Sequence, residues 1–273
     1  MFERPVGVFD SGLGGASVLR EALCLLPNEN YIYYGDSGNA PYGDKSDDDI
    51  TALTMACIDK LMAMDVKAIL IACNTATAAS VSKVRQLMNQ YSMPIISIEP
   101  AIKPACALPG TGKVFMMATL ATTRLNRYLA LQARMPDPSR VINIPCPGIV
   151  ERVEAGIFDD DAYDDLFDKY FAPYVGTEVD AIVLGCTHYP LLRSTLRQIM
   201  GEKVNLVNPA YETARELKSL LEREGLNNDG KQNYEGAMHE FYVSDAANKF
   251  KNFANSILPY GVDTTQLIHI EDY

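Results

Sequence analysis

The hydrophobic positions of the chain form short, nearly continuous runs that alternate with amphipathic stretches. Runs such as VGVFD (6–10), AILIAC (68–73) and AIVLGC (181–186) contain almost no interspersed polar residues. Such runs are typical of strands that are buried on both faces of a parallel sheet. The pattern therefore predicts an α/β fold in which helices cover both faces of parallel sheets.

Following the alternation along the chain assigns each run to a strand or a helix. Strands are expected at 5–10, 31–36, 68–73, 94–99, 113–119, 140–145, 181–186, 204–209 and 239–245. Helices are expected at 15–25, 46–64, 77–90, 101–107, 122–134, 161–174, 191–199, 211–224 and 246–257. Ser46 is the expected cap of a helix whose first turn is acidic, and the polar stretch 226–236 is expected to form a surface loop.

Length and composition narrow the class of protein. The 273 residues are 48% hydrophobic, enough for one large domain or two ordinary ones. With 24 basic and 35 acidic residues the net charge is −11, which argues against a nucleic-acid partner. No apolar run approaches the roughly 20 residues that span a bilayer, and no signal peptide is visible. We therefore expect a cytoplasmic protein with no membrane partner, whose six cysteines are reduced thiols.

Two segments of the chain share one form. AILIACNTATAA (68–79) and AIVLGCTHYPLL (181–192) each run from apolar residues through a small residue to a cysteine and polar residues. We interpret them as an internal duplication: two α/β halves, each presenting one cysteine at the carboxyl end of a strand. Ligands bind beyond such strand ends, so Cys73 and Cys186 are expected to converge on one cleft. The expected domains are 1–97 plus 208–273, and 98–207.

Two thiols that face one carbon could invert a stereocentre, because one removes a proton and the other returns it on the opposite face. Each cysteine precedes a predicted helix, whose amino end would favour the thiolate. Two other interpretations remain: buried cysteines without a role, and a zinc site formed by Cys73, Cys186 and His188, although the usual short ligand spacings are missing.

The segment DSGLGG (10–15) allows two interpretations. It follows a strand and opens a helix, and Asp36 ends the next strand, which imitates a dinucleotide-binding fingerprint. However, Ser17 stands at the third glycine position. A turn that presents Asp10, Ser11 and backbone N–H groups explains the glycines equally well.

Four motifs in sequence order carry a family resemblance: GVFDSGLGGASV, YYGDSGNAPYGDKS, ACNTAT and LGCTHYPLL. They closely resemble the glutamate racemases of the aspartate/glutamate racemase superfamily, over nearly the whole chain. The resemblance implies two pseudo-symmetric parallel-sheet α/β domains with the active site in the cleft between them. It also implies L- to D-glutamate racemisation without pyridoxal phosphate or metal, supplying D-glutamate for peptidoglycan, by an enzyme that often forms homodimers.

The resemblance further implies roles for individual residues. Cys73 takes the α-proton from D-glutamate and Cys186 takes it from L-glutamate, with Asp10 and His188 assisting and Glu151 matching a carboxylate near that histidine. The implied substrate-binding positions are Asp10, Ser11, Pro41, Tyr42, Gly43, Cys73, Asn74, Thr75, Thr119, Thr122, Cys186, Thr187 and His188.

Two other functions remain open from the sequence. One is a racemase of the same superfamily that acts on aspartate or a related amino acid, which pocket size would discriminate. The other is a non-catalytic module that binds an amino acid or a nucleotide. Retention of both cysteines together with Asp10 and His188 argues against the second.

Overall fold

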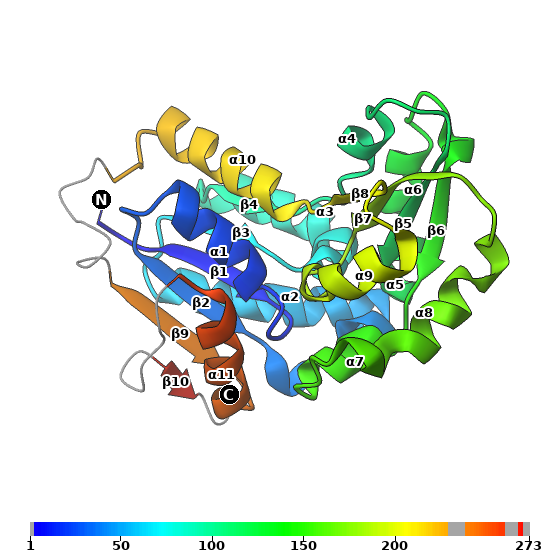
Figure 1. Ribbon diagram of the computed structural model, residues 1–273. Helices are drawn as coiled ribbons and strands as arrows, with labels where there is room; N and C mark the ends of the chain where they lie inside the picture. The colour runs from blue at the N-terminus through cyan, green and yellow to red at the C-terminus, as the bar shows by residue number, and fades with distance from the viewer. Residues whose placement is uncertain (1–2, 229–237, 260–266, 270–273) are drawn as a thin grey trace.

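The computed structural model describes residues 3–228, 238–259 and 267–269, and Figure 1 shows them as two adjoining α/β bodies. The first body has a sheet in the order β10-β9-β2-β1-β3-β4, and the second a sheet in the order β6-β5-β7-β8. All strand pairs are parallel. The strands are β1 (Val6–Asp10), β2 (Tyr31–Gly35), β3 (Ala68–Ile71), β4 (Ile95–Ser97), β5 (Lys113–Ala118), β6 (Val141–Pro145), β7 (Val179–Leu184), β8 (Asn205–Val207), β9 (His239–Val243) and β10 (Leu267–His269).

Helices cover both faces of each sheet, as the continuous apolar strands predict. They are α1 (Ala16–Leu25), α2 (Asp47–Ala63), α3 (Asn74–Tyr91), α4 (Ile102–Cys106), α5 (Leu120–Arg124), α6 (Asn126–Gln132), α7 (Ile149–Glu154), α8 (Asp164–Phe171), α9 (Arg193–Met200), α10 (Ala210–Arg223) and α11 (Ala247–Ile257). In the first body, α1, α10 and α11 pack on one face of the sheet and α2 and α3 on the other. In the second body, α7, α8 and α9 pack opposite α4 and α6.

The chain passes between the two bodies twice. It leaves the first sheet after β4 and returns after β8, so that β9 pairs with β2, and Tyr31 lies opposite His239. The prediction of two parallel-sheet α/β units is confirmed, while the residue boundaries 97/98 and 207/208 stay a prediction. Within the described residues, no helix has the length and apolar character needed to cross a bilayer.

Most predicted elements are present, and three helices differ from their predicted form. Strand β10 was not predicted. The helix expected at 122–134 is two helices, because Leu125 between them adopts an extended conformation (φ −70°, ψ 133°). The helix expected at 77–90 begins earlier, at Asn74. The helix expected at 161–174 contains a shorter α-helix flanked by 3-10 turns. Helix α7 was not predicted at all, and most of the loop expected at 226–236 lies outside the described residues.

The predicted cap of α2 is confirmed. The Ser46 hydroxyl oxygen accepts a hydrogen bond from the Asp49 amide at 3.2 Å, and three acidic residues occupy the first turn. This satisfies one of the otherwise unpaired N–H groups at the start of the helix.

Candidate active site

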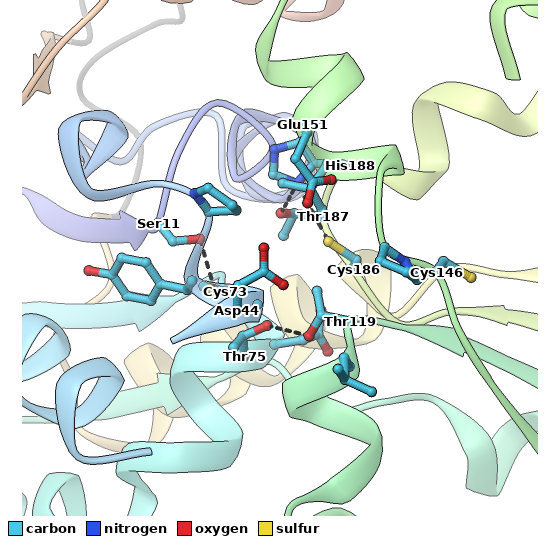
Figure 2. A pocket seen from close by; sticks show the side chains of 17 residues that line it. Ser11, Asp44, Cys73, Thr75, Thr119, Cys146, Glu151, Cys186, Thr187 and His188 are labelled. Atoms are coloured by element: carbon cyan, nitrogen blue, oxygen red, sulfur yellow. Dashed lines mark hydrogen bonds between the residues drawn. The ribbon is translucent and has the colours of Figure 1, made fainter. Parts of the chain in front are cut away.

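A partly open cavity lies between the two bodies at the carboxyl ends of their strands (Figure 2). It comprises about 480 Å³ of space between side chains, of which about 20 Å³ admits the centre of a water molecule. Twelve predicted site residues line it: Ser11, Pro41, Tyr42, Gly43, Cys73, Asn74, Thr75, Thr119, Glu151, Cys186, Thr187 and His188.

The other two predicted residues are fully buried behind the lining. Asp10 accepts a hydrogen bond from the Thr187 hydroxyl at 3.3 Å. Thr122 lies 3.3 Å from the Thr75 hydroxyl and 3.0 Å from the Thr119 hydroxyl. Both therefore act on the cavity through residues that line it. The lining also includes residues that were not predicted: Asp44, Leu120, Cys146, Pro147 and Val150.

Cys73 occupies the N-terminal cap of α3. Its sulfur accepts a hydrogen bond from the Ala76 amide at 3.4 Å and lies 3.2 Å from the Ser11 hydroxyl. Burial raises the pKa of the Cys73 thiol to about 12, and the charge of Asp10 adds to this effect, although both hydrogen bonds oppose it. The thiol at this position is therefore protonated in the cavity, ready to give a proton rather than to take one.

Cys186 reaches the cavity from the second body, opposite Cys73 (Figure 2), and its surroundings differ. The expected helix does not follow it directly, because a 3-10 turn at Tyr189–Leu192 precedes α9. The prediction of a helix amino end is thus confirmed for Cys73 and wrong for Cys186. Instead, the Cys186 sulfur lies 3.5 Å from Nδ1 of His188.

His188 links Cys186 to the partly buried carboxylate of Glu154. Burial opposes the imidazolium, but the Cys186 sulfur and Glu154 outweigh it and raise the pKa of His188 well above its usual range. Nε2 of His188 lies 2.7 Å from Oε1 of Glu154, and the same oxygen accepts from the Leu13 amide of the first body at 2.8 Å. Glu154 thus joins the imidazole to the opposite body.

This arrangement corrects the expectation for Glu151. The acid that is hydrogen-bonded to His188 is Glu154, whereas the Glu151 carboxylate lines the cavity without a hydrogen bond to any described residue. Both acids belong to α7, which starts after Gly148 in a left-handed conformation (φ 98°). Acids three positions apart lie on one face of a helix, so a predicted helix at this place would have made Glu154 a second candidate.

The glycines of DSGLGG allow the two bodies to approach closely. A Cβ atom at Gly14 would lie 2.5 Å from the Thr187 hydroxyl and 2.7 Å from Nδ1 of His188. Asp36 is engaged elsewhere, because it accepts from the Tyr42 and Ser244 hydroxyls at 2.7 and 2.9 Å. These contacts support the interpretation as a turn that presents Asp10 and Ser11 over the dinucleotide fingerprint.

Asp10 is held as a buried acid beside the thiols. It accepts from the Gly12 amide at 3.0 Å and from Thr187. Burial raises the pKa of Asp10, while His188 and the backbone amides of Gly12 and Gly15 act in the opposite direction. A buried carboxylate of this kind suits a bound ammonium group, which would replace the lost water.

Neutral donors supply the rest of the lining. The hydroxyls of Thr75 and Thr119 lie 2.9 Å apart. Asn74 is 3% exposed, and neither polar atom of its amide has a hydrogen-bond partner among the described residues. No Lys or Arg occurs among the described residues that line the cavity. A carboxylate bound here would therefore be held by hydroxyl, amide and α3 backbone N–H groups.

A metal site is not formed by these residues. Among the described residues no three His, Cys, Asp or Glu side chains converge as metal ligands. Cys73, Cys186 and His188, the alternative zinc ligands, are instead engaged in the hydrogen bonds given above.

Comparisons with known proteins agree on one family. A family model described as Asp/Glu/Hydantoin racemase matches residues 17–217. A relative from Clostridium perfringens named glutamate racemase is 45% identical over 228 residues, which cover 84% of this chain and 87% of the relative. The structure resembles that of a glutamate racemase from Francisella tularensis in complex with D-glutamate, with TM-score 0.84, 29% identity and coverage of 99% and 98% of the two chains. A glutamate racemase isoform from Bacillus anthracis gives TM-score 0.85 at the same identity and coverage.

Proposed function

Since the chain belongs to the aspartate/glutamate/hydantoin racemase family, we propose that it interconverts L- and D-glutamate with Cys73 and Cys186 as its two bases. The observation that carries the proposal is that both thiols line one cavity from opposite bodies. The names of its relatives support glutamate as the substrate. Pyridoxal phosphate and metal are not required, because two thiols suffice for the proton transfers.

The surroundings of the two sulfurs suit opposite protonation states at the start of the reaction. A cationic His188 beside Cys186 favours a sulfur that takes the α-proton of L-glutamate as a thiolate. Cys73, held as a thiol, then gives its proton to the opposite face of the α-carbon and yields D-glutamate. The reverse reaction starts from the opposite protonation states, with Cys73 as the thiolate. Each turnover in either direction therefore exchanges the states of the two cysteines.

The cavity also suits the intermediate between the two proton transfers. The α-proton of an amino acid is a very weak acid, so the carbanion needs preorganised donors in a site without bulk water. We assign the substrate ammonium to Asp10, with Ser11 beside it, and the carboxylates to Asn74, Thr75, Thr119, Thr187 and the backbone N–H groups of Tyr42 and Gly43. Pro41, which has no N–H group, lines the cavity beside them. Thr122 positions the other threonines. Glu154 replaces Glu151 as the acid that positions His188.

The biological setting follows from this activity. D-glutamate is a building block of peptidoglycan, so we propose that the protein supplies it in the cytoplasm, as a homodimer. The alternative substrate is aspartate or a related amino acid. Exchange of the α-proton in D₂O, followed by NMR on glutamate and aspartate in parallel, distinguishes the two substrates.

The two-base mechanism is tested by Cys73→Ser and Cys186→Ser. Serine is far too weak an acid to replace a thiol, so racemisation should fall at least about a thousandfold in both variants. With a chlorinated glutamate that eliminates HCl after one deprotonation, Cys73→Ser should prefer the L-isomer and Cys186→Ser the D-isomer. Equal loss of elimination from both isomers in both variants would contradict the two-base mechanism.

A further inference from the structure

Asp44 is a carboxylate without a partner in a cavity proposed to bind an acidic amino acid. It ends the 3-10 turn Tyr42–Asp44, and it is an exposed residue that lines the cavity (Figure 2). No hydrogen bond or ion pair joins it to another described residue.

The charges around Asp44 are not balanced within the cavity. Lys45 and Arg124 lie nearby in the structure, where the Arg124 guanidinium donates to the Lys45 carbonyl at 3.2 Å, but neither lines the cavity. The described lining contains no Lys or Arg, and it includes a second unpaired carboxylate, Glu151, from the opposite body. The one lining cation, His188, is paired with Glu154 beside Cys186, so an anionic ligand near Asp44 meets negative charge that no Lys or Arg of the described lining offsets.

Asp44 is also poorly placed to hold the ammonium group of the substrate. The ammonium adjoins the α-carbon, which must lie between the two thiols. Asp10 is fully buried there, with Thr187 and Ser11 linking it to the surroundings of Cys186 and Cys73. Asp44 is exposed, on the turn that also supplies the backbone at Tyr42 and Gly43. The proposed function assigns a substrate carboxylate to the backbone of this turn, and because the α-carbon lies deeper, between the thiols, we assign the side-chain carboxylate to it.

We propose, resting on the function assigned above, that Asp44 lowers the affinity of the site for glutamate because it opposes binding of the substrate's side-chain carboxylate. Like charges several ångströms apart at a partly exposed site interact by enough to change an affinity about three- to tenfold. The affinity for glutamate is thereby held below what the hydroxyl, amide and backbone donors would give. Release of the product, which carries the same charge, is favoured by the same repulsion.

The test is Asp44→Asn, with Asp48→Asn as the matched control. Asp48 lies four residues further along, in the first turn of α2 and outside the lining, so its replacement removes the same charge from the protein as a whole. Asp44→Asn should lower the KM for both glutamate enantiomers about three- to tenfold with little change in kcat. Asp48→Asn should leave the KM within about twofold. Calorimetric binding of D-glutamate gives the same comparison without relying on turnover.

Each other result overturns the inference. An unchanged KM shows no repulsion, a raised KM identifies Asp44 as an ammonium or positioning group, and an equal fall in Asp48→Asn assigns the effect to net charge. A second measurement uses the unmodified protein: its KM should fall as salt is added, because salt screens the repulsion, and Asp44→Asn should respond less. If the unmodified protein binds and racemises glutamate but Asp44→Asn has no effect, only this inference fails.

Discussion

Replacing Glu154 by Gln tests whether the acid on His188 sets the chemistry of Cys186. The carboxylate lies 2.7 Å from Nε2 of a buried imidazole. A buried hydrogen bond that involves a charged group contributes about 1.5–3 kcal/mol. Since 1.36 kcal/mol corresponds to a factor of ten, kcat/KM should fall between about tenfold and 150-fold in Glu154→Gln.

Which isomer loses more elimination activity is a sharper test than the size of the fall in kcat/KM. The two enantiomers have equal free energy, so the kcat/KM values for the two directions of racemisation must fall together in any variant. Elimination from a chlorinated glutamate reports only one deprotonation. It should therefore fall more for the L-isomer, which Cys186 deprotonates, than for the D-isomer.

The pH profile gives an independent readout of the same change. Glu154 is one of the groups that raise the pKa of His188. Its neutralisation lowers that pKa, so the imidazolium is lost at a lower pH. The alkaline limb of the kcat/KM profile should shift to lower pH in Glu154→Gln. The acidic limb should move less.

Glu151→Gln is the matched control, because the two acids share α7 and the control lacks the hydrogen bond to His188. It should show neither the preference between isomers nor the shift of the alkaline limb. An equal or larger effect from Glu151→Gln would refute the assignment of Glu154 as the residue that positions His188.

Two further substitutions test how closely the two bodies must approach and how a buried histidine makes stability depend on pH. Gly14→Ala places a Cβ 2.5 Å from the Thr187 hydroxyl, so kcat/KM should fall at least about tenfold. Steady-state kinetics measures this loss, and a thermal melt shows whether the variant is still folded. An unchanged kcat/KM would show that the bodies need not approach so closely. His239 is buried, and burial lowers its pKa from 6.5 to about 4. The unfolded chain therefore binds more protons in this range, and stability is lost as the pH falls from about 6.5 to about 4. Between pH 7 and pH 5 the His239 contribution to the free energy of unfolding should fall by about 2 kcal/mol, which urea denaturation can measure. If His239→Gln shows the same dependence of stability on pH, His239 is not its cause.

The sequence predicted the sheets well because their signal is strong and local. Runs such as AILIAC and AIVLGC have no polar face, and only a strand covered on both sides accommodates them. The matching form of the two runs also placed Cys73 and Cys186 at equivalent strand ends. The chain carries no comparable signal for the different surroundings of the two sulfurs. These depend on how soon a helix starts after each cysteine, which differs between α3 and α9.

Glu154 was missed for a related reason. A helix of six residues such as α7 gives too short an apolar period to be recognised. Even with the helix known, the choice between Glu151 and Glu154 depends on its rotation about its own axis. That rotation is set by packing in the second body and by the Leu13 amide of the first body. Asp44 was missed because its proposed role depends on the charges of the residues that line the cavity. Those residues are distant in sequence.

The passage of the chain through both bodies bears on the order in which the protein folds during synthesis. The second sheet is formed by β5 to β8, a continuous stretch, and can be completed as soon as β8 has been made. The first sheet must wait, because β2 lacks its outer neighbour until β9 emerges from the ribosome. Until then one edge of β2, an apolar strand that is buried in the finished protein, has no neighbouring strand. Such unpaired edges promote association between chains. Newly made chains are therefore expected to be most prone to aggregate between the completion of β8 and the arrival of β9.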